Sequence, residues 1–178
     1  ITFAVMQGTD AIMLSGETAA GKHPLKALNM MDTVAQRAEA HLRTGSMTLP
    51  ETTDRSKNEL ARSATAMATH INAKALLVFT RRGYMATLLS RCRPFPPIFA
   101  FTNMSNVRRK LNLFWGITSF RIQFSKDPEK TIQRAMNLLH ERGLAATGDQ
   151  VIVVSDILAG EEFVETIQVR TIATNGDT

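Results

Sequence analysis

The sequence predicts an α/β protein: a mostly parallel five-stranded sheet with helices on both faces and an antiparallel edge strand, preceded by a separate β/α unit. Three observations support this prediction. From residue 58 onward, short apolar runs alternate with helical patterns of roughly ten to fifteen residues, the order typical of a parallel sheet. Ahead of them stand one apolar run, a polar loop and a long helical pattern. The last predicted strand is much more polar than the others, which suits a sheet edge.

Residues 1–43 contain the separate β/α unit. Ala11 to Leu14 is a short apolar run that predicts a buried strand, and Ser15 to Gly21 has the small, polar, glycine-bearing composition of a loop. Pro24 suits the first turn of a helix that we expect to continue to about Arg43. Because helices of neighbouring units cover a parallel strand on both faces, this unit must belong to a larger assembly. The expected buried face of the helix consists of Leu25, Leu28, Met31, Val34 and Ala38.

Residues 44–57 are interpreted as a linker, because they are rich in Thr, Ser and Pro and have little apolar content. Residues 58–178 then form one domain. Its last two strands are joined by a loop too short for a parallel crossover, so we expect an antiparallel hairpin there. The expected helices are Asn58–Ile71, Tyr84–Cys92, Ser105–Phe114 and Pro128–Arg142. The expected strands are Ala75–Thr80, Ile98–Phe101, Ile117–Ile122, Val151–Ser155 and Glu165–Ile172.

Composition argues against several classes of function. The formal charge is +5, but the basic residues are scattered, aromatic residues make up only 6%, and no nucleic-acid-binding module is visible. No apolar run approaches the roughly 18 residues that a membrane span needs. The single cysteine, Cys92, rules out an intramolecular disulfide and fits a reducing compartment. We interpret it as a structural thiol, although the neighbouring Arg91 and Arg93 could lower its pKa.

The first candidate site is the loop Ser15-Gly16-Glu17-Thr18, which follows the first predicted strand. Two hydroxyls and a carboxylate at the carboxyl end of such a strand occupy the position where α/β barrels keep their active sites. A polar loop in which Thr18 caps a helix explains the same residues equally well. The two interpretations stay open.

The second candidate is Thr80-Arg81-Arg82-Gly83, at the carboxyl end of the predicted strand Ala75–Thr80 and directly before a helix. Ligands of open parallel sheets bind at this edge, and arginine forks can grip phosphate oxygens. The alternative is a solvated loop, and the loop lacks the Gly-Lys-Ser/Thr ending of a Walker motif.

Two further groups of residues predict no site. A basic group formed by Arg91, Arg93, Arg108, Arg109 and Lys110 is explained by solvated helix faces. The histidines show no ligand spacing, so we predict no metal site from His23, His41, His70 and His140.

A family resemblance adds to these inferences. The segment GTDAIMLSGETAAGKHPLKAL, Gly8 to Leu28, resembles the end of the pyruvate kinase barrel. Downstream, ALLVFTRRGYMATLLSRCRP, PIFAFT, LNLFWGI, GDQVIVVSD and IQV are similar, in the same order, to that family's C-terminal domain. The resemblance implies that residues 1–43 are the last β/α unit of a TIM barrel. It also implies that residues 58–178 are the C-terminal regulatory and assembly domain.

The resemblance implies a glycolytic enzyme that transfers the phosphoryl group of phosphoenolpyruvate to ADP, with magnesium and potassium, as a homo- or hetero-oligomer. The family's catalytic lysine and metal ligands come from earlier barrel strands, so we expect this chain alone to be inactive. Ser15 and Glu17 match the rim of the family's active site. The alternative is a non-catalytic ligand-binding or assembly module of the same fold. LSRCRP, PIFAFT and VRRKLNL resemble plant plastid members most, which predicts the chloroplast stroma, with the cytoplasm as the alternative.

Residues Thr80 to Met85 match the loop that holds a sugar phosphate in members activated by fructose 1,6-bisphosphate, where the pattern is Thr-Lys-Ser-Gly-Arg-Ser. Here Arg82 replaces the first serine, Tyr84 the arginine and Met85 the last serine. In the facing loop Ile157–Phe163, Glu161 and Glu162 would repel a bisphosphate. We therefore predict that fructose 1,6-bisphosphate does not activate the protein, while Arg81 and Arg82 leave room for another anionic effector.

Overall fold

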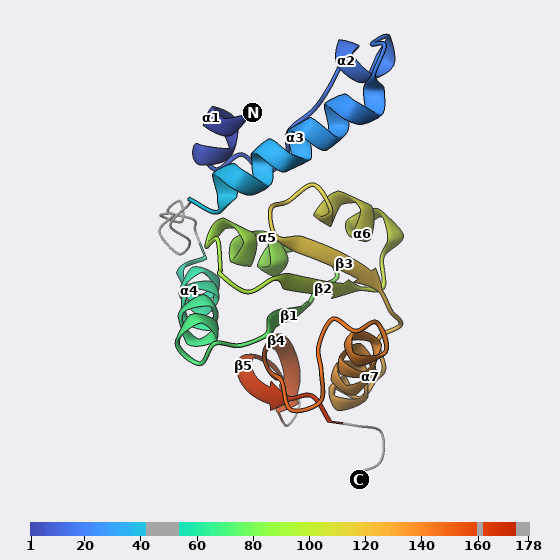
Figure 1. The fold of residues 1–178 in the computed structure, drawn as a ribbon. Coiled ribbons are helices and arrows are strands. Elements are labelled where there is room, and N and C mark those ends of the chain that lie inside the picture. The colour runs from blue at the N-terminus through green and yellow to red at the C-terminus, as the bar shows by residue number, and fades with distance from the viewer. Residues whose placement is uncertain (42–53, 160–161, 174–178) are drawn as a thin grey trace. The chain divides into compact units, whose positions relative to one another are not determined.

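The computed structural model describes residues 1–41, 54–159 and 162–173, and only the backbone of residues 156–159, 162 and 163. It divides into two compact units, Ile1–Thr44 and Gly45–Thr178 (Figure 1). No helix in the described part of the chain is long and apolar enough to cross a membrane.

The first unit contains three helices, α1 (Thr2–Met6), α2 (Gly16–Ala19) and α3 (Pro24–Glu39). Pro24 occupies the first turn of α3, as its fixed φ angle favours. The expected strand Ala11–Leu14 is wrong, because these residues are in no strand. A strand requires a hydrogen-bonded neighbour, and the described residues of this unit supply none. The expected loop Ser15–Gly21 contains the single turn of α2.

The expected buried face of α3 is also largely wrong. Leu25 is 74% exposed and Leu28 is 47% exposed, whereas Ala38 is buried. The apolar spacing is helical as predicted, but a helical stripe is buried only where other elements cover it. Among the described residues of the first unit, the short helices α1 and α2 are the elements that pack on α3.

The second unit is built on a five-stranded sheet in the order β3-β2-β1-β4-β5. Neighbouring strands from β3 to β4 are parallel, and β5 pairs with β4 in the antiparallel direction. The mostly parallel sheet with an antiparallel edge strand is therefore confirmed. The strands are β1 (Ala75–Phe79), β2 (Ile98–Thr102), β3 (Ile117–Arg121), β4 (Gln150–Ala159) and β5 (Glu162–Thr171).

Helices cover both faces of this sheet. Successive side chains of a strand point to opposite faces, so an apolar strand such as β1 has side chains to bury on each of them. Leu76 and Val78 of β1 pack with α4 (Arg55–His70), α5 (Tyr84–Arg91) and α6 (Ser105–Leu111). Ala75 and Leu77 pack with α7 (Pro128–Glu141) on the other face. Figure 1 shows α7 on the opposite side of the sheet from α5 and α6. The bidentate contact of Arg170 with Glu129, at 2.6 and 3.1 Å, joins β5 to α7.

Helix α4 begins before the expected Asn58. The Asp54 carboxylate accepts a hydrogen bond of 3.1 Å from the Lys57 backbone N–H, which satisfies one of the unpaired donors of the first turn. Residues 55–57, expected in the linker, are therefore helical, and Lys57 has a fixed position on α4. Residues 42–53 of the expected linker lie outside the described part of the chain. Helix α6 is shorter than expected and ends at Leu111 rather than at Phe114.

The β4–β5 hairpin is longer than predicted. Its backbone register continues from Gln150 opposite Thr171 to Ala159 opposite Glu162, so most of the expected loop Ile157–Phe163 belongs to the two strands. Each added antiparallel pair satisfies backbone N–H and C=O groups whatever the polarity of the side chains. Glu161 and the Glu162 side chain lie outside the described residues, so their predicted repulsion of a bisphosphate stays a prediction.

Candidate functional site

The loop that connects β1 to α5 is a tight turn at the carboxyl edge of the parallel strands. Thr80 N–H donates to the Phe101 carbonyl of β2 at 2.9 Å, which continues the sheet into the loop. The Thr80 hydroxyl oxygen accepts a hydrogen bond of 2.8 Å from Gly83 N–H, which closes the turn. Gly83 precedes the first residue of α5 with a φ of 85°, in the left-handed region that glycine adopts most easily.

The structure separates the six predicted effector-loop positions into different environments. Arg81 and Arg82 are exposed, and neither forms an ion pair within the described residues. Thr80 uses its hydroxyl oxygen to close the turn. Tyr84 and Met85 belong to α5, and Met85 packs against the core under that helix. The two arginines therefore remain available to an anion, whereas Met85 faces the protein interior.

The hydrogen bond from Gly83 to Thr80 leads to a prediction. Thr80→Val removes the acceptor and leaves the buried Gly83 N–H without its partner, so we expect the free energy of unfolding to fall by about 1 kcal/mol. Urea unfolding followed by fluorescence of Trp115, which lies in the second unit, measures this change. Thr80→Ser keeps the hydroxyl and is the matched control. Equal stability of the valine and serine variants would contradict the assigned role.

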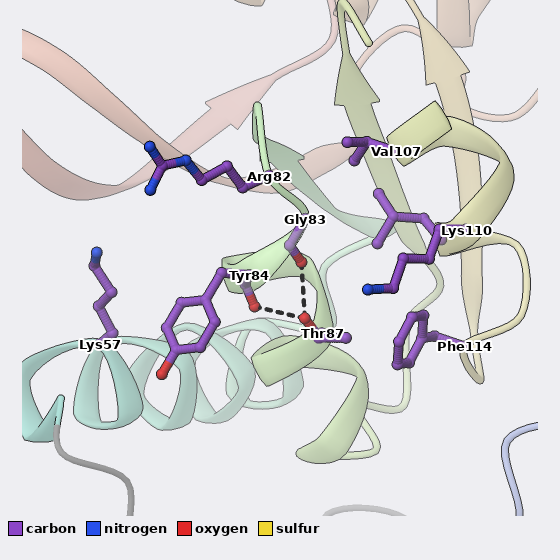
Figure 2. Close-up of a pocket in the computed structure, with 9 residues that line it drawn as sticks. Lys57, Arg82, Gly83, Tyr84, Thr87, Val107, Lys110 and Phe114 are labelled. Atoms are coloured by element: carbon purple, nitrogen blue, oxygen red, sulfur yellow. Dashed lines mark hydrogen bonds between the residues drawn. The ribbon is translucent and has the colours of Figure 1, made fainter. Parts of the chain in front are cut away.

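A pocket of about 460 Å³ lies beside the start of α5 (Figure 2). Its walls come from α4, the loop before α5, α5 itself, α6 and the residues that follow α6. Of the predicted loop residues, Arg82, Gly83 and Tyr84 line it, whereas Thr80, Arg81 and Met85 do not. The lining residues are Lys57, Arg82, Gly83, Tyr84, Thr87, Val107, Lys110, Leu111 and Phe114.

Sequence reasoning missed this pocket, although one signal for it exists. Val107, Lys110, Leu111 and Phe114 follow the spacing of one helical face, with a lysine inserted among apolar residues. The sequence pattern places Lys110 on a solvated helix face and Lys57 in the linker. Neither residue is near Tyr84 in the sequence, so only the packing of α4 and α6 around α5 brings them together.

Lys57 is held in place by two carboxylates. Its ammonium lies 3.3 Å from Glu165 of β5 and 3.6 Å from Asp54, and 5.8 Å from the centre of the Tyr84 ring. The hydrogen bond with Glu165 and that carboxylate's charge raise the pKa of Lys57, with a smaller contribution from Asp54. Lys57 is therefore a cation whose charge is already balanced within the protein.

The loop Ser15–Thr18 forms a self-contained helix start. Ser15 N–H donates to the Glu17 carboxylate at 3.1 Å, and the Thr18 hydroxyl donates to the Ser15 carbonyl at 3.2 Å. Hydrogen bonds from the backbone N–H groups of Glu17 and Ser15 lower the pKa of the Glu17 carboxyl group, so it stays ionised. Both Ser15 and Glu17 are exposed. This geometry holds a carboxylate in a fixed orientation at the surface of the first unit.

The remaining candidates show structural contacts. Arg93 packs its guanidinium 4.9 Å from the centre of the Trp115 ring, while Arg108 and Arg109 are exposed on α6. The predicted basic group is thus divided between a packed and a solvated part. Within the described residues, no group of three or more His, Cys, Asp or Glu side chains could hold a metal ion.

Cys92 is 6% exposed, and burial raises the pKa of its thiol above the ordinary value. We therefore expect the native thiol to react with Ellman's reagent at pH 8 at least about tenfold more slowly than in urea-unfolded chain. Because the folded pKa is the higher one, this group's contribution to stability is present below the unfolded pKa of about 8.5 and falls as pH rises through the folded pKa. Cys92→Ala should lose that pH dependence, and equal native and unfolded reaction rates would contradict the assignment.

Comparisons with known proteins agree with this fold. The family model described as "Pyruvate kinase, alpha/beta domain" matches residues 58–170. The chain is 45% identical over 166 residues to "Pyruvate kinase isozyme A, chloroplastic" of Ricinus communis, covering 89% of this chain and 28% of that protein. It is 42% identical over 181 residues to "Plastidial pyruvate kinase 3, chloroplastic" of Arabidopsis thaliana, covering 99% of this chain and 32% of that protein.

Among solved structures, pyruvate kinase of Cryptosporidium parvum in complex with ADP matches with a TM-score of 0.84 and 29% identity. The match covers 96% of this chain and 35% of that one. The chain thus spans about a third of the length of the proteins that it matches. Since the family model covers most of the second unit and relatives above 40% identity cover most of the chain, the chain belongs to the pyruvate kinase family.

Proposed function

We propose that this chain is part of a pyruvate kinase that transfers the phosphoryl group of phosphoenolpyruvate to ADP and gives pyruvate and ATP. The observation that carries the proposal is the match of residues 58–170 to the family's α/β domain, together with 45% identity to a plant pyruvate kinase. The related structure in complex with ADP supports the nucleotide substrate.

In this proposal, residues 1–43 belong to the last β/α unit of the catalytic barrel, and the linker ends before α4, which begins at Arg55. The regulatory and assembly domain therefore begins with α4 rather than at residue 58. Ser15 and Glu17 lie at the rim of the active site, where the ionised Glu17 carboxylate and the backbone that it fixes help to shape the catalytic face. Magnesium and potassium supply charge neutralisation for the phosphates in the full-length enzyme. The proposal assigns their ligands to earlier strands of the barrel.

The chain alone is expected to be inactive, because it spans about a third of its relatives and the proposal assigns the catalytic lysine and metal ligands elsewhere. The test is an assay of the 178-residue chain with phosphoenolpyruvate, ADP, magnesium and potassium, coupled to lactate dehydrogenase. We expect no turnover above background, with a plant pyruvate kinase as the positive control. Turnover comparable to that control would overturn the assignment of the catalytic groups.

The alternative function is a non-catalytic module of the same fold. Sequencing of the transcript upstream of Ile1 distinguishes the two functions. A barrel with the lysine and paired acidic metal ligands supports the kinase. An unrelated upstream sequence supports the module.

Fructose 1,6-bisphosphate is not expected to bind the loop Thr80–Met85. Arg82 and Met85 replace hydroxyl residues of the family pattern, and the Thr80 hydroxyl oxygen already accepts a hydrogen bond from Gly83. Calorimetric titration of the chain with the bisphosphate should give no heat beyond dilution. Saturable binding at micromolar concentration would contradict the prediction.

A plastid location and an oligomeric parent complete the proposal. The relatives from Ricinus communis, Nicotiana tabacum and Arabidopsis thaliana are named chloroplastic or plastidial, which supports the chloroplast stroma. A fluorescent fusion of the full-length parent in leaf cells tests the location, and cytoplasmic fluorescence alone would contradict it.

Size-exclusion chromatography with light scattering tests whether the full-length parent is an oligomer. A monomeric mass would contradict that prediction.

A further inference from the structure

We propose that the pocket between α5 and α6 binds a small organic anion that carries an apolar body, with Lys110 as its charged partner. The proposal rests on the pocket itself and is independent of the proposed catalytic function. The pocket shares Arg82, Gly83 and Tyr84 with the effector loop, but its charged partner Lys110 and its apolar wall lie on α6 and just after it, outside that loop.

The apolar part of the pocket comes from one face of α6 and its extension. Val107 and Phe114 are half-buried and Leu111 is 2% exposed, so this wall is packed against the core and holds its shape. On the opposite side, the Thr87 hydroxyl shares its single proton between the carbonyls of Gly83 and Tyr84, at 2.8 and 2.9 Å. These bonds fix the first turn of α5. An aromatic or branched aliphatic group therefore meets a preformed apolar wall.

The charged part of the pocket selects an anion. Three cationic side chains, Lys57, Arg82 and Lys110, line it, and none of the lining residues in the described part of the chain is acidic. Lys57 is balanced by Glu165 and Asp54. In Figure 2, Arg82 directs its guanidinium to the Lys57 side of Tyr84, away from Phe114.

Lys110 differs from both of these cations. Its ammonium points toward Thr87 and Phe114 in Figure 2, and it forms no ion pair within the described residues. Lys110 is exposed, so its flexible side chain can follow a ligand. It is therefore the cation placed next to the apolar wall, while Arg82 adds positive potential from the other side of the pocket.

Size and chemistry together define the ligand class. A volume of about 460 Å³ lies within the range of roughly 300 to 1,000 Å³ that is usual for small-molecule sites. An inorganic anion would leave the wall formed by Leu111 and Phe114 in contact with water. A neutral hydrophobe would leave Lys110 without a partner. A carboxylate or phosphate ester attached to a ring satisfies both parts.

The first experiment compares three probes by NMR titration of the ¹⁵N-labelled 178-residue chain: phenyl phosphate, inorganic phosphate and benzyl alcohol. We expect phenyl phosphate to shift the amide signals of Thr87 and Lys110 in a saturable way, with an affinity at least about fivefold higher than either partial probe. Equal binding of inorganic phosphate and phenyl phosphate would overturn the proposal, because the apolar wall would then contribute nothing.

The second experiment tests which cationic side chain binds the anion. Lys110→Gln should weaken phenyl phosphate binding by about fivefold, and Arg82→Gln by about twofold. Lys130→Gln is the matched control, because Lys130 is an exposed lysine of α7 on the other face of the sheet. The thermal unfolding midpoint of each variant shows that the fold is intact. An unchanged affinity in Lys110→Gln, or an equal loss in Lys130→Gln, would contradict the proposal.

Discussion

Replacement of Phe101 by alanine is expected to lower the free energy of unfolding of the second unit by about 3–5 kcal/mol. Phe101 is fully buried on β2, on the face of the sheet covered by α7. Its ring centre lies 5.2 Å from that of Phe79 and 5.5 Å from that of Phe120, so truncation removes two stacked contacts and leaves a cavity. Because close-packed neighbours relax only partly, the cavity remains costly.

Urea unfolding followed by Trp115 fluorescence measures this loss, since Trp115 lies in the same unit. Phe95→Ala is the control: Phe95 is 80% exposed, so its removal should change stability by less than about 0.5 kcal/mol. A loss below about 1 kcal/mol in Phe101→Ala would mean that Phe101 does not occupy the core position described.

Gly83→Ala carries the second largest expected effect, a loss of about 2–3 kcal/mol. Two causes add. The φ of 85° places any L-residue with a Cβ atom in the left-handed region. That Cβ atom would also lie 3.2 Å from Leu111 Cδ2 and 3.4 Å from Val107 Cγ1, so these side chains of α6 would have to shift by a few tenths of an ångström. The movement would disturb the apolar wall of the pocket.

Gly148→Ala separates the two causes. Gly148 has a φ of 89° and no heavy atom within 4 Å of a built Cβ, so its substitution carries only the backbone cost of about 1–2 kcal/mol. The same urea titration applied to both variants gives the packing contribution as a difference. If Gly83→Ala were no more destabilising than Gly148→Ala, the close contact between α5 and α6 would be refuted.

The architecture of the second unit could be predicted because its signals are local. The apolar runs of β1 and β2 predict buried strands, and the polar Glu165 and Gln168 of β5 indicate a strand at the edge of the sheet. The start of α4 could have been found from the same kind of signal, since Asp54 precedes a helical pattern as a capping residue does. The first unit shows the limit of such signals. Leu25 and Leu28 have the spacing of a buried face but are exposed, because spacing describes a helix and burial needs a second element.

The sequence by itself determined the alternation of strands and helices, the antiparallel edge strand, the turn before α5 and the family to which the chain is similar. Each of these depends on residues that are near one another along the chain. Only the tertiary structure decided which residues of other helices lie beside this turn. Lys57, Thr87 and Lys110 belong to three different helices, and their side chains share a pocket because α4, α5 and α6 pack on one face of the sheet. No local pattern specifies that meeting, since it depends on strand order and on the packing of buried side chains between the helices.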